Sequence, residues 1–323
     1  MEHLIDIVLL GLLMITGFAI VRIRSLLAVA MLTSIYSLLS AALFMVLDAV
    51  DVALTEAAIG AGISTILILA TVALTSDEEK APRHTPLLPL FVVFATGAAL
   101  IYGTTDMPHY GDPAAPIHHV AQTYLHDTPG EIGVPNVVTS VLASYRGYDT
   151  LGEVTVILTA GAGVLALLGY RIRRRDINNS EIRKLVVLRV IAKLFLPLIL
   201  LFALYVLFHG DYGPGGGFQA GVIFATGFIL YALAFGLGNA QRVIPHRLLR
   251  NMAALGVLIY AAVGIESMLL GGKFLEYRVL AKDPLTGQHL GIMLIEVGVG
   301  ITVTAVMLII YYGFVSRRHS RDI

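Results

Sequence analysis

Several ionisable side chains of this sequence stand inside long apolar runs, where a charge is costly and a functional reason for it is expected. The acidic ones are Glu56, Glu153, Glu266 and Glu296. A carboxyl group in such surroundings can alternate between a neutral and a charged form as water or a cation approaches. These residues therefore indicate a proton or cation relay.

Glu56 is followed closely by two glycines, Gly60 and Gly62. Glycines at this spacing weaken a helix just past the acid, and they favour a local π-bulge or a water-filled gap there. A second interpretation is an interfacial carboxylate, because Glu56 lies only about one turn from the predicted outer end of its helix. The sequence leaves both open.

Lys193 is the one lysine expected inside an apolar run, four residues after Arg189 and four before Pro197. Arg189 and Lys193 therefore share a helix face, and Pro197 frees the carbonyl of Lys193 itself. A lysine opposite a carboxylate is an element of a proton relay. The alternative is a lysine whose ammonium group snorkels to the cytoplasmic interface.

Glu296 and Glu266 have no cation one helical turn away on their own helix. A partner must come from another helix or subunit, or the acid stays protonated. Glu296 is expected about two turns inside its span, so it is the stronger candidate for a role. Glu266 lies nearer the boundary.

Arg146, Asp149 and Glu153 follow one another at i, i+3 and i+7. If this stretch is helical, the three share a face and form an ion-paired set near the outer boundary. If Gly147 and Gly152 break the helix, Asp149 caps a turn instead. The second interpretation does not account for Glu153 entering the membrane.

A polar, glycine-dense hinge, residues 209–219, separates two apolar runs that are each long enough to cross a bilayer. It is too short for a domain linker, so it must turn two membrane helices back on each other. Its glycines allow close packing and positive φ, and its proline is expected in the first turn of the next helix. The residues assigned to turning and packing are His209, Asp211, Pro214, Gly215, Gly216, Gly217 and Phe218.

Composition places the chain among polytopic helical membrane proteins. Of its 323 residues, 57% are hydrophobic and 14% charged, with a mean hydropathy of +0.83, whereas soluble domains carry about 25% charged residues. The absence of cysteine excludes disulfides and thiolate metal or iron–sulfur sites. A net charge of zero argues against a nucleic-acid partner. Because Glu2 and Asp6 replace a basic region, the first run is expected to be a retained helix.

Apolar runs predict an all-α fold with nine membrane spans. The expected spans are 3–21, 26–47, 52–75, 86–103, 151–170, 186–208, 215–237, 248–270 and 289–314.

Lys and Arg follow every odd-numbered span, which predicts an N-terminus outside and a C-terminus in the cytoplasm. These residues are Arg22 and Arg24; Lys80 and Arg83; Arg171, Arg173, Arg174, Arg175, Arg183 and Lys184; Arg242, Arg247 and Arg250; and Arg317, Arg318 and Arg321. The basic run 171–184 divides the chain into a five-helix part and a four-helix part.

Segment 104–150 is the one long external segment. Its first part is proline-rich and expected to be irregular, whereas residues 136–145 regain helical spacing. It holds four histidines, His109, His118, His119 and His126. Their spacing does not imply the converging geometry of a metal site, so contacts to solvent or a partner are expected. No cofactor is predicted, because the chain has no phosphate-binding loop, nucleophile elbow or dinucleotide fingerprint.

Three stretches, in order, resemble the multisubunit Mrp-type Na+/H+ antiporters and the related membrane arms of membrane-bound hydrogenases. Residues 51–75, around Glu56, resemble the small D-type protein of those hydrogenases, which is also found fused at the C-terminal end of the A-type antiporter protein. Residues 135–156 resemble the E-type hydrogenase protein. Residues 186–314, with the His-Gly and Pro-Gly-Gly-Gly-Phe pattern of the hinge, resemble the B-type antiporter protein. Asp211 stands where family hinges often have His or Asn, and Glu296 where Asp is expected.

The resemblance implies three units: 1–84 with three helices, 85–178 with two, and 179–323 with four. It implies that Glu56, Glu153 and Lys193 belong to an ion pathway. It also implies a membrane subunit of a cation/proton antiporter, and not an enzyme, with Na+, H+, lipid and other subunits, including large proton-channel subunits, as partners. The alternative is a membrane-arm or scaffold subunit of a hydrogenase-like or complex-I-like enzyme, with soluble redox subunits attached.

Overall fold

The computed structural model describes residues 2–73, 75, 77–79, 87–109, 111–169 and 186–318. Within these ranges, nine helices are long and apolar enough to cross a membrane, which confirms the predicted number. In this part of the chain the regular secondary structure is helical, apart from a single β-bridge between Ser25 and Glu78. Some basic residues used for orientation lie outside the described part, namely those at 80, 83, 171, 173–175, 183, 184 and 321 and the side chains at 317 and 318.

The first four spans occupy the N-terminal third of the chain. They comprise α1 (Glu2–Arg22), α2 (Leu26–Val46), the third span from Val50 to Val72, and α5 (Leu87–Thr104). The third span consists of α3 (Val50–Glu56), a π-helix η1 (Ala57–Ser64) and α4 (Thr65–Val72). The π-helix begins directly after Glu56 and contains Gly60 and Gly62, so the π-bulge indicated by these glycines is confirmed.

Segment 104–150 is more ordered than the sequence predicted. It contains α6 (Ile117–Glu131), where we expected irregular structure, followed by α7 (Val137–Thr139) and a second π-helix η2 (Ser140–Tyr145). Helix α6 accommodates its prolines at its two ends. Pro116 stands at the N-cap, and Pro129 stands in the last turn. The helical spacing over 136–145 is confirmed, although part of it is π-helical.

The remaining spans are α8 (Gly147–Leu168), α9 (Val186–His209), α10 (Gly217–Phe235), α12 (His246–Leu269) and α13 (Pro284–Arg318). A short α11 (Leu237–Val243) and a 3₁₀ turn η4 (Tyr277–Leu280) connect them. Helix α13 begins five residues earlier than predicted. Asp283 precedes it and its carboxylate accepts hydrogen bonds from the Thr286 amide and hydroxyl, at 2.9 and 2.6 Å. Pro284 then occupies the first helical position, which proline favours.

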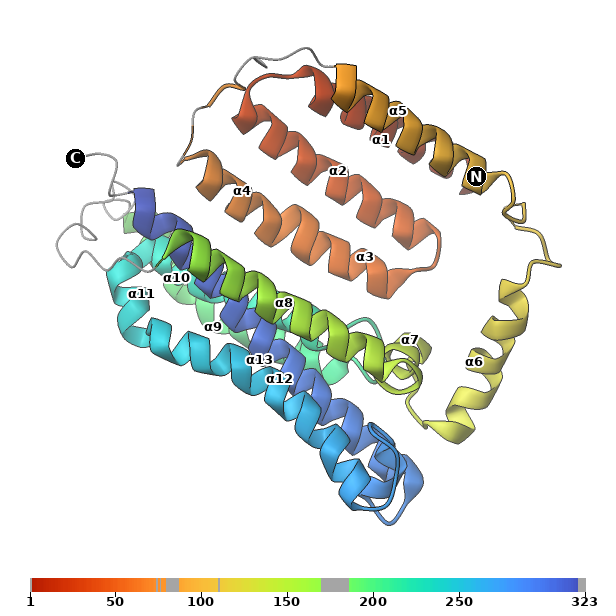
Figure 1. Cartoon of the computed structure of the whole chain (residues 1–323). Coiled ribbons are helices and arrows are strands. Elements are labelled where there is room, and N and C mark those ends of the chain that lie inside the picture. The colour runs from red at the N-terminus through yellow and green to blue at the C-terminus, as the bar shows by residue number, and fades with distance from the viewer. Residues whose placement is uncertain are drawn as a thin grey trace.

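The helices form two groups that meet along the third span (Figure 1). Helices α1 to α5 lie on one side and α8 to α13 on the other, and η1 contacts α10 while α4 contacts α13. Helix α13 lies centrally in the second group, in contact with α8, α10 and α12. The fifth span, α8, thus packs against α12 and α13 of the second group, although the sequence grouped it with the spans that precede it.

Candidate functional site

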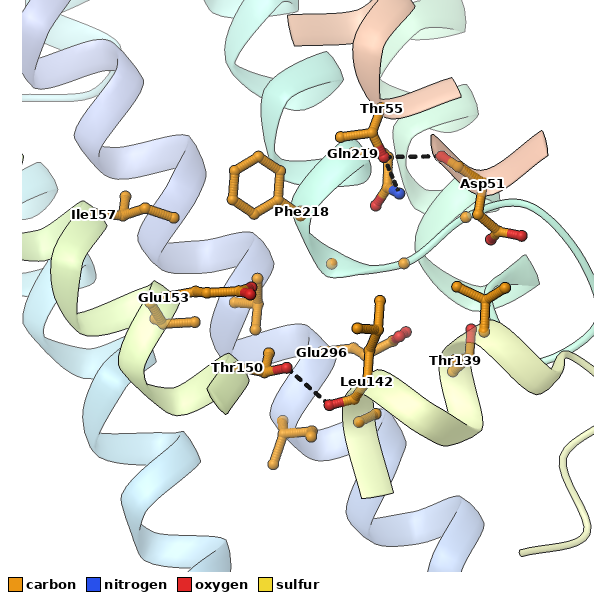
Figure 2. A pocket seen from close by; sticks show the side chains of 18 of the residues that line it. Asp51, Thr55, Thr139, Leu142, Thr150, Glu153, Ile157, Phe218, Gln219 and Glu296 are labelled. Carbon is orange, nitrogen blue, oxygen red and sulfur yellow. Dashed lines mark hydrogen bonds between the residues drawn. The ribbon is translucent and has the colours of Figure 1, made fainter. Parts of the chain in front are cut away.

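A cavity of about 630 Å³ lies where the two groups of helices meet. Its walls come from α3, α7, η2, α8, the hinge with the start of α10, and α13 (Figure 2). Three carboxylates line it, those of Asp51, Glu153 and Glu296, each from a different span. Sequence segments far apart therefore combine to build one acidic, otherwise mostly apolar chamber.

The hinge glycines lie directly against the side chain of Glu296. A Cβ on Gly210 would stand 3.1 Å from Glu296 Oε2, and one on Gly216 would stand 3.2 Å from Oε1. A Cβ on Gly217 would overlap the Glu296 backbone carbonyl. Gly216 also has φ +123°, a conformation that side chains disfavour. The hinge is thus part of the acidic site, whereas the sequence assigned it to packing alone.

Asn136 connects three segments of the chain at the edge of this cavity. Its buried side-chain amide donates to Asp51 Oδ1 at 3.1 Å and to the hinge carbonyls of Gly210 and Gly213 at 3.2 and 2.9 Å. Its Oδ1 accepts from the Val138 amide and caps α7. The same side chain therefore fixes α3, α7 and the hinge relative to one another.

Two further hydrogen bonds close the polar wall. Thr139 donates to the Gly210 carbonyl at 2.6 Å. Gln219 donates to Thr55 Oγ1 at 2.6 Å (Figure 2). Both Thr139 and Gln219 are buried. The first bond joins α7 to the hinge and the second joins α10 to α3.

Asp211 and His289 form a pair beside the hinge. Their Oδ2 and Nδ1 atoms are 3.2 Å apart, and the other ring nitrogen of His289 lies 3.2 Å from the Gly133 carbonyl oxygen. The backbone carbonyl of Asp211 accepts from the Asn136 amide at 3.0 Å.

Buried tyrosines hold η2 and the start of α8 against the C-terminal part of the chain. Tyr277 donates to the Ala143 carbonyl at 2.9 Å and Tyr260 to the Gly147 carbonyl at 2.6 Å. Burial raises the pKa of the Tyr277 hydroxyl far above its ordinary value, so it stays a donor at physiological pH. Burial, and then the hydrogen bond that Glu131 accepts, raise the pKa of Tyr145 as well.

The expected ion-paired set of Arg146, Asp149 and Glu153 is only partly present. Arg146 pairs with Asp149 at 2.6 Å, but both side chains are more than half exposed. Helix α8 begins at Gly147, so Arg146 precedes it and the three do not share a helix face; nor is Asp149 a cap, because it lies in the first turn. Glu153 points into the cavity from α8 (Figure 2).

The other predicted residues lie away from the cavity. The carboxylate of Glu56 lies over Gly60 beside Ser37, where a Cβ on Gly60 would stand 2.6 Å from Glu56 Oε1 and 2.5 Å from Ser37 Oγ. Lys193 and Glu266 are exposed and do not line the cavity. Arg189, one turn from Lys193, stacks over the Phe235 ring at 5.8 Å.

One prediction about the hinge is wrong, and the structure shows where the histidines of the hinge and of the outer segment lie. Pro214 does not occupy the first turn of the next helix, because α10 begins at Gly217, after Gly216 with its φ of +123°. His209 ends α9 and stacks on Tyr205. The four histidines of segment 104–150 are exposed, and one of them, His118, lies 3.1 Å from the Asp112 carbonyl.

Sequence reasoning missed four residues of this site: Asp51, Asn136, Gln219 and His289. Each stands near a helix end, where polar residues are ordinary and give no signal of their own. Asn136 carried one indication, since an asparagine before an apolar helix predicts an N-cap.

Three family models match successive parts of this chain. One described as a domain related to the MnhB subunit of Na+/H+ antiporters matches residues 187–309, and two that describe the MBH proteins MbhD and MbhE match residues 11–77 and 97–184. The putative antiporter subunit mnhB2 of Staphylococcus aureus strain Newman is 37% identical over 128 residues, covering 36% of this chain and 90% of that protein. The chain belongs to the MnhB family of antiporter subunits. Its N-terminal half carries the MbhD-like and MbhE-like units.

Two further relatives match about half of this chain. A probable K(+)/H(+) antiporter protein of the A/B type from Rhizobium meliloti strain 1021 is 29% identical over 192 residues, covering 52% of this chain and 19% of that protein. The uncharacterized protein MJ1307 of Methanocaldococcus jannaschii is 29% identical over 161 residues, covering 44% of this chain. The chain spans 60% of the latter protein's length, and much less of the former's.

Two solved complexes contain chains of similar structure. The Mrp complex from Dietzia sp. DQ12-45-1b has a chain with TM-score 0.75 and 27% identity, and the match covers 95% of this chain and 34% of that one. The membrane-bound sulfane sulfur reductase, an archaeal respiratory membrane complex, has one with TM-score 0.54 and 32% identity, covering 70% of this chain and 96% of that one. The chain is thus an antiporter-type multi-pass membrane subunit of a prokaryotic membrane.

Proposed function

We propose that this chain is an ion-translocating subunit of a multisubunit cation/proton antiporter, and that Glu296 and Glu153 bind the transported ions in turn. The observation that carries the proposal is the single cavity lined by Asp51, Glu153 and Glu296. The printed names of its relatives give Na+ or K+ as the cation exchanged for H+. Na+ is the cation expected here.

The geometry favours exchange because the chamber is acidic and otherwise mostly apolar. A carboxylate in such a place stabilises either a bound proton or a monovalent cation, and one occupant excludes the other electrostatically. Glu296 is the central group, since it lines the cavity and the hinge glycines Gly210 and Gly216 lie against its two oxygens. Partner subunits, including large proton-channel subunits, would complete the pathway. Glu56 and Lys193 remain proposed contributors at separate places.

Neutralising the cavity acids tests this proposal. In everted vesicles that carry the whole complex, Glu296→Gln and Glu153→Gln should reduce Na+- or K+-driven proton movement to background, because glutamine cannot exchange a proton. Glu266→Gln is the matched control, since Glu266 is exposed outside the cavity. Copurification of the partner subunits checks assembly. Normal antiport in assembled Glu296→Gln complexes would exclude this role.

A second function is a membrane-arm subunit of a respiratory redox complex. The observation in its favour is the likeness to a chain of the sulfane sulfur reductase, of which 96% is covered at 32% identity. Redox chemistry would then reside in soluble partners. Affinity purification of the native assembly decides between the two: large antiporter subunits alone support the first, and flavin- or iron–sulfur-containing partners support the second.

The placement of the chain follows the sequence argument. We propose an outer N-terminus, a cytoplasmic C-terminus, and units bounded near residues 84 and 178. The proposed boundaries lie close to the gaps between the three family matches.

A further inference from the structure

The Asp211–His289 pair lies at the point where the hinge passes along α13. His289 and Glu296 are seven residues apart on this helix, so they share a face and are about 10.5 Å apart along the axis. The hinge spans this interval, because the side chain of Asp211 contacts His289, and its neighbour in the chain, Gly210, lies against Glu296 Oε2.

The hydrogen-bond partners of His289 determine its protonation. One ring nitrogen faces the carboxylate oxygen of Asp211 and the other faces the carbonyl oxygen of Gly133. Both partners are acceptors, whereas a neutral imidazole has only one N–H to donate. A neutral histidine beside an ionised aspartate therefore leaves one of these contacts without a hydrogen. One additional proton, shared by the pair, satisfies both contacts.

The exposed fractions of the two side chains indicate which of them takes up the extra proton from solvent. The His289 side chain is 35% exposed, whereas that of Asp211 is 18% exposed. The histidine can thus exchange protons with solvent, and the aspartate is the more buried member and is next in the chain to Gly210, which lies against Glu296. The acidic cavity beyond is large enough to hold water, whose share of liquid volume is about 30 Å³ per molecule.

We propose that His289 and Asp211 are the proton-exchange pair that loads Glu296 from the hinge end of the protein. The imidazolium gives its Nδ1 proton to Asp211 Oδ2, which leaves a neutral imidazole with its Nε2–H toward Gly133. The aspartic acid then passes that proton to cavity water, and water delivers it to the Glu296 carboxylate. Solvent reprotonates the imidazole and completes the cycle. This inference rests on the proposed function, because it assigns a proton route to the same cavity.

Other titratable groups around this end of α13 have partners of their own. They lie on η4, α6, η2 and directly before α13. Tyr277 donates to the Ala143 carbonyl, Arg278 to the Glu131 backbone carbonyl and Tyr145 to the Glu131 carboxylate, and the Asp283 carboxylate accepts from Thr286. Asp51 is bound by Asn136. Asp211 is thus the acid that faces His289 among the described residues.

The test uses the assembled complex in everted vesicles and measures antiport rate against pH. Both His289→Gln and Asp211→Asn should slow antiport by about a hundredfold, which is within the range that a positioned proton donor contributes. Both should also remove the limb of the pH profile that belongs to the pair. The double variant should be no slower than either single one, because the two residues act as one unit. The matched control, His126→Gln, changes an exposed histidine of α6 and should leave rate and profile unchanged.

The outcomes separate this inference from the proposed function. If Glu296→Gln is inactive but both pair variants keep the wild-type rate and pH profile, the proton enters elsewhere and the pair is not its route. If Glu296→Gln is fully active, the proposed function fails and this inference fails with it. If His289→Gln does not assemble, Asp211→Asn decides alone, since it keeps the side-chain shape and loses only the charge and the exchangeable proton.

Discussion

Asn136 shows how one small amide can fix the geometry of a site made from distant segments. It has two N–H donors shared among three oxygens, those of Asp51, Gly210 and Gly213. Because the residue is buried, its loss would leave Asp51 Oδ1 and the Gly213 carbonyl without this donor, whereas the Gly210 carbonyl would keep the Thr139 hydroxyl. We infer that it is a positioning residue, which holds the acid of α3 and the hinge around the cavity.

Changing Asn136 should destabilise the protein in two distinct ways. Asn136→Ala leaves buried oxygens unsatisfied and should cost about 1–3 kcal/mol. Asn136→Asp should cost more at neutral pH, because its carboxylate faces three oxygens. Acidification should restore Asn136→Asp and not Asn136→Ala, since only a protonated carboxyl can donate. The measurement is the thermal midpoint of the purified complex between pH 5 and 8, with the exposed Asn251→Asp as charge control. A pH-independent Asn136→Asp variant would contradict this assignment.

Sequence reasoning identified the acids of the cavity better than their partners. Glu153 and Glu296 could be predicted, because a carboxylate in an apolar run is rare and costly. Asp51, Asn136 and His289 could not, because they lie near helix ends and acquire their importance only through contacts with residues more than 70 positions away. Lys193 and Glu266 show the opposite case, since position in an apolar run does not reveal which way a side chain faces.

At the scale of elements, the third span shows how glycine sets helix form. Its middle turn is the π-helix η1, which starts after Glu56 and contains both glycines. Gly60 lies under the Glu56 carboxylate and against Ser37 of α2, so its missing side chain makes room for both. Gly62 has only ordinary contact, 3.6 Å from the Ala57 carbonyl oxygen. The two glycines therefore have different roles in one element.

This contrast predicts unequal effects of alanine. Gly60→Ala should displace Glu56 or Ser37 and cost about 1–3 kcal/mol, as overpacking does. Gly62→Ala should be neutral or slightly stabilising, because alanine favours helix more than glycine. Thermal unfolding of the complex, with antiport as a second readout, measures both. Equal losses in the two variants would show that flexibility of η1, and not space at Gly60, is what matters.

Which elements could be predicted follows from the strength of their signal. The nine spans were predictable because apolar runs of about 20 residues are unmistakable. Helix α6 was not, since it is polar and proline-flanked, and neither was the start of α13, which depends on the Asp283 cap and not on hydropathy. The fifth span shows that order in sequence does not give order in space, because α8 packs against α12 and α13.

At the scale of the whole molecule, the charge distribution predicts an outer N-terminus and a cytoplasmic C-terminus. Because the chain has no cysteine, single introduced cysteines can test this orientation without background labelling of the chain. Single-cysteine variants at Met107 and Tyr212 place a thiol at the proposed outer face, where the native side chains are 65% and 68% exposed. Val243→Cys, where the native side chain is 54% exposed, places one at the other end of the seventh span. A membrane-impermeant maleimide should label the first two in intact cells and the third only after permeabilisation. Since Asp211 and Tyr212 are adjacent, this result would also fix the side from which the Asp211–His289 pair draws its proton. The reverse labelling pattern would invert the topology and, with it, the direction of proton entry.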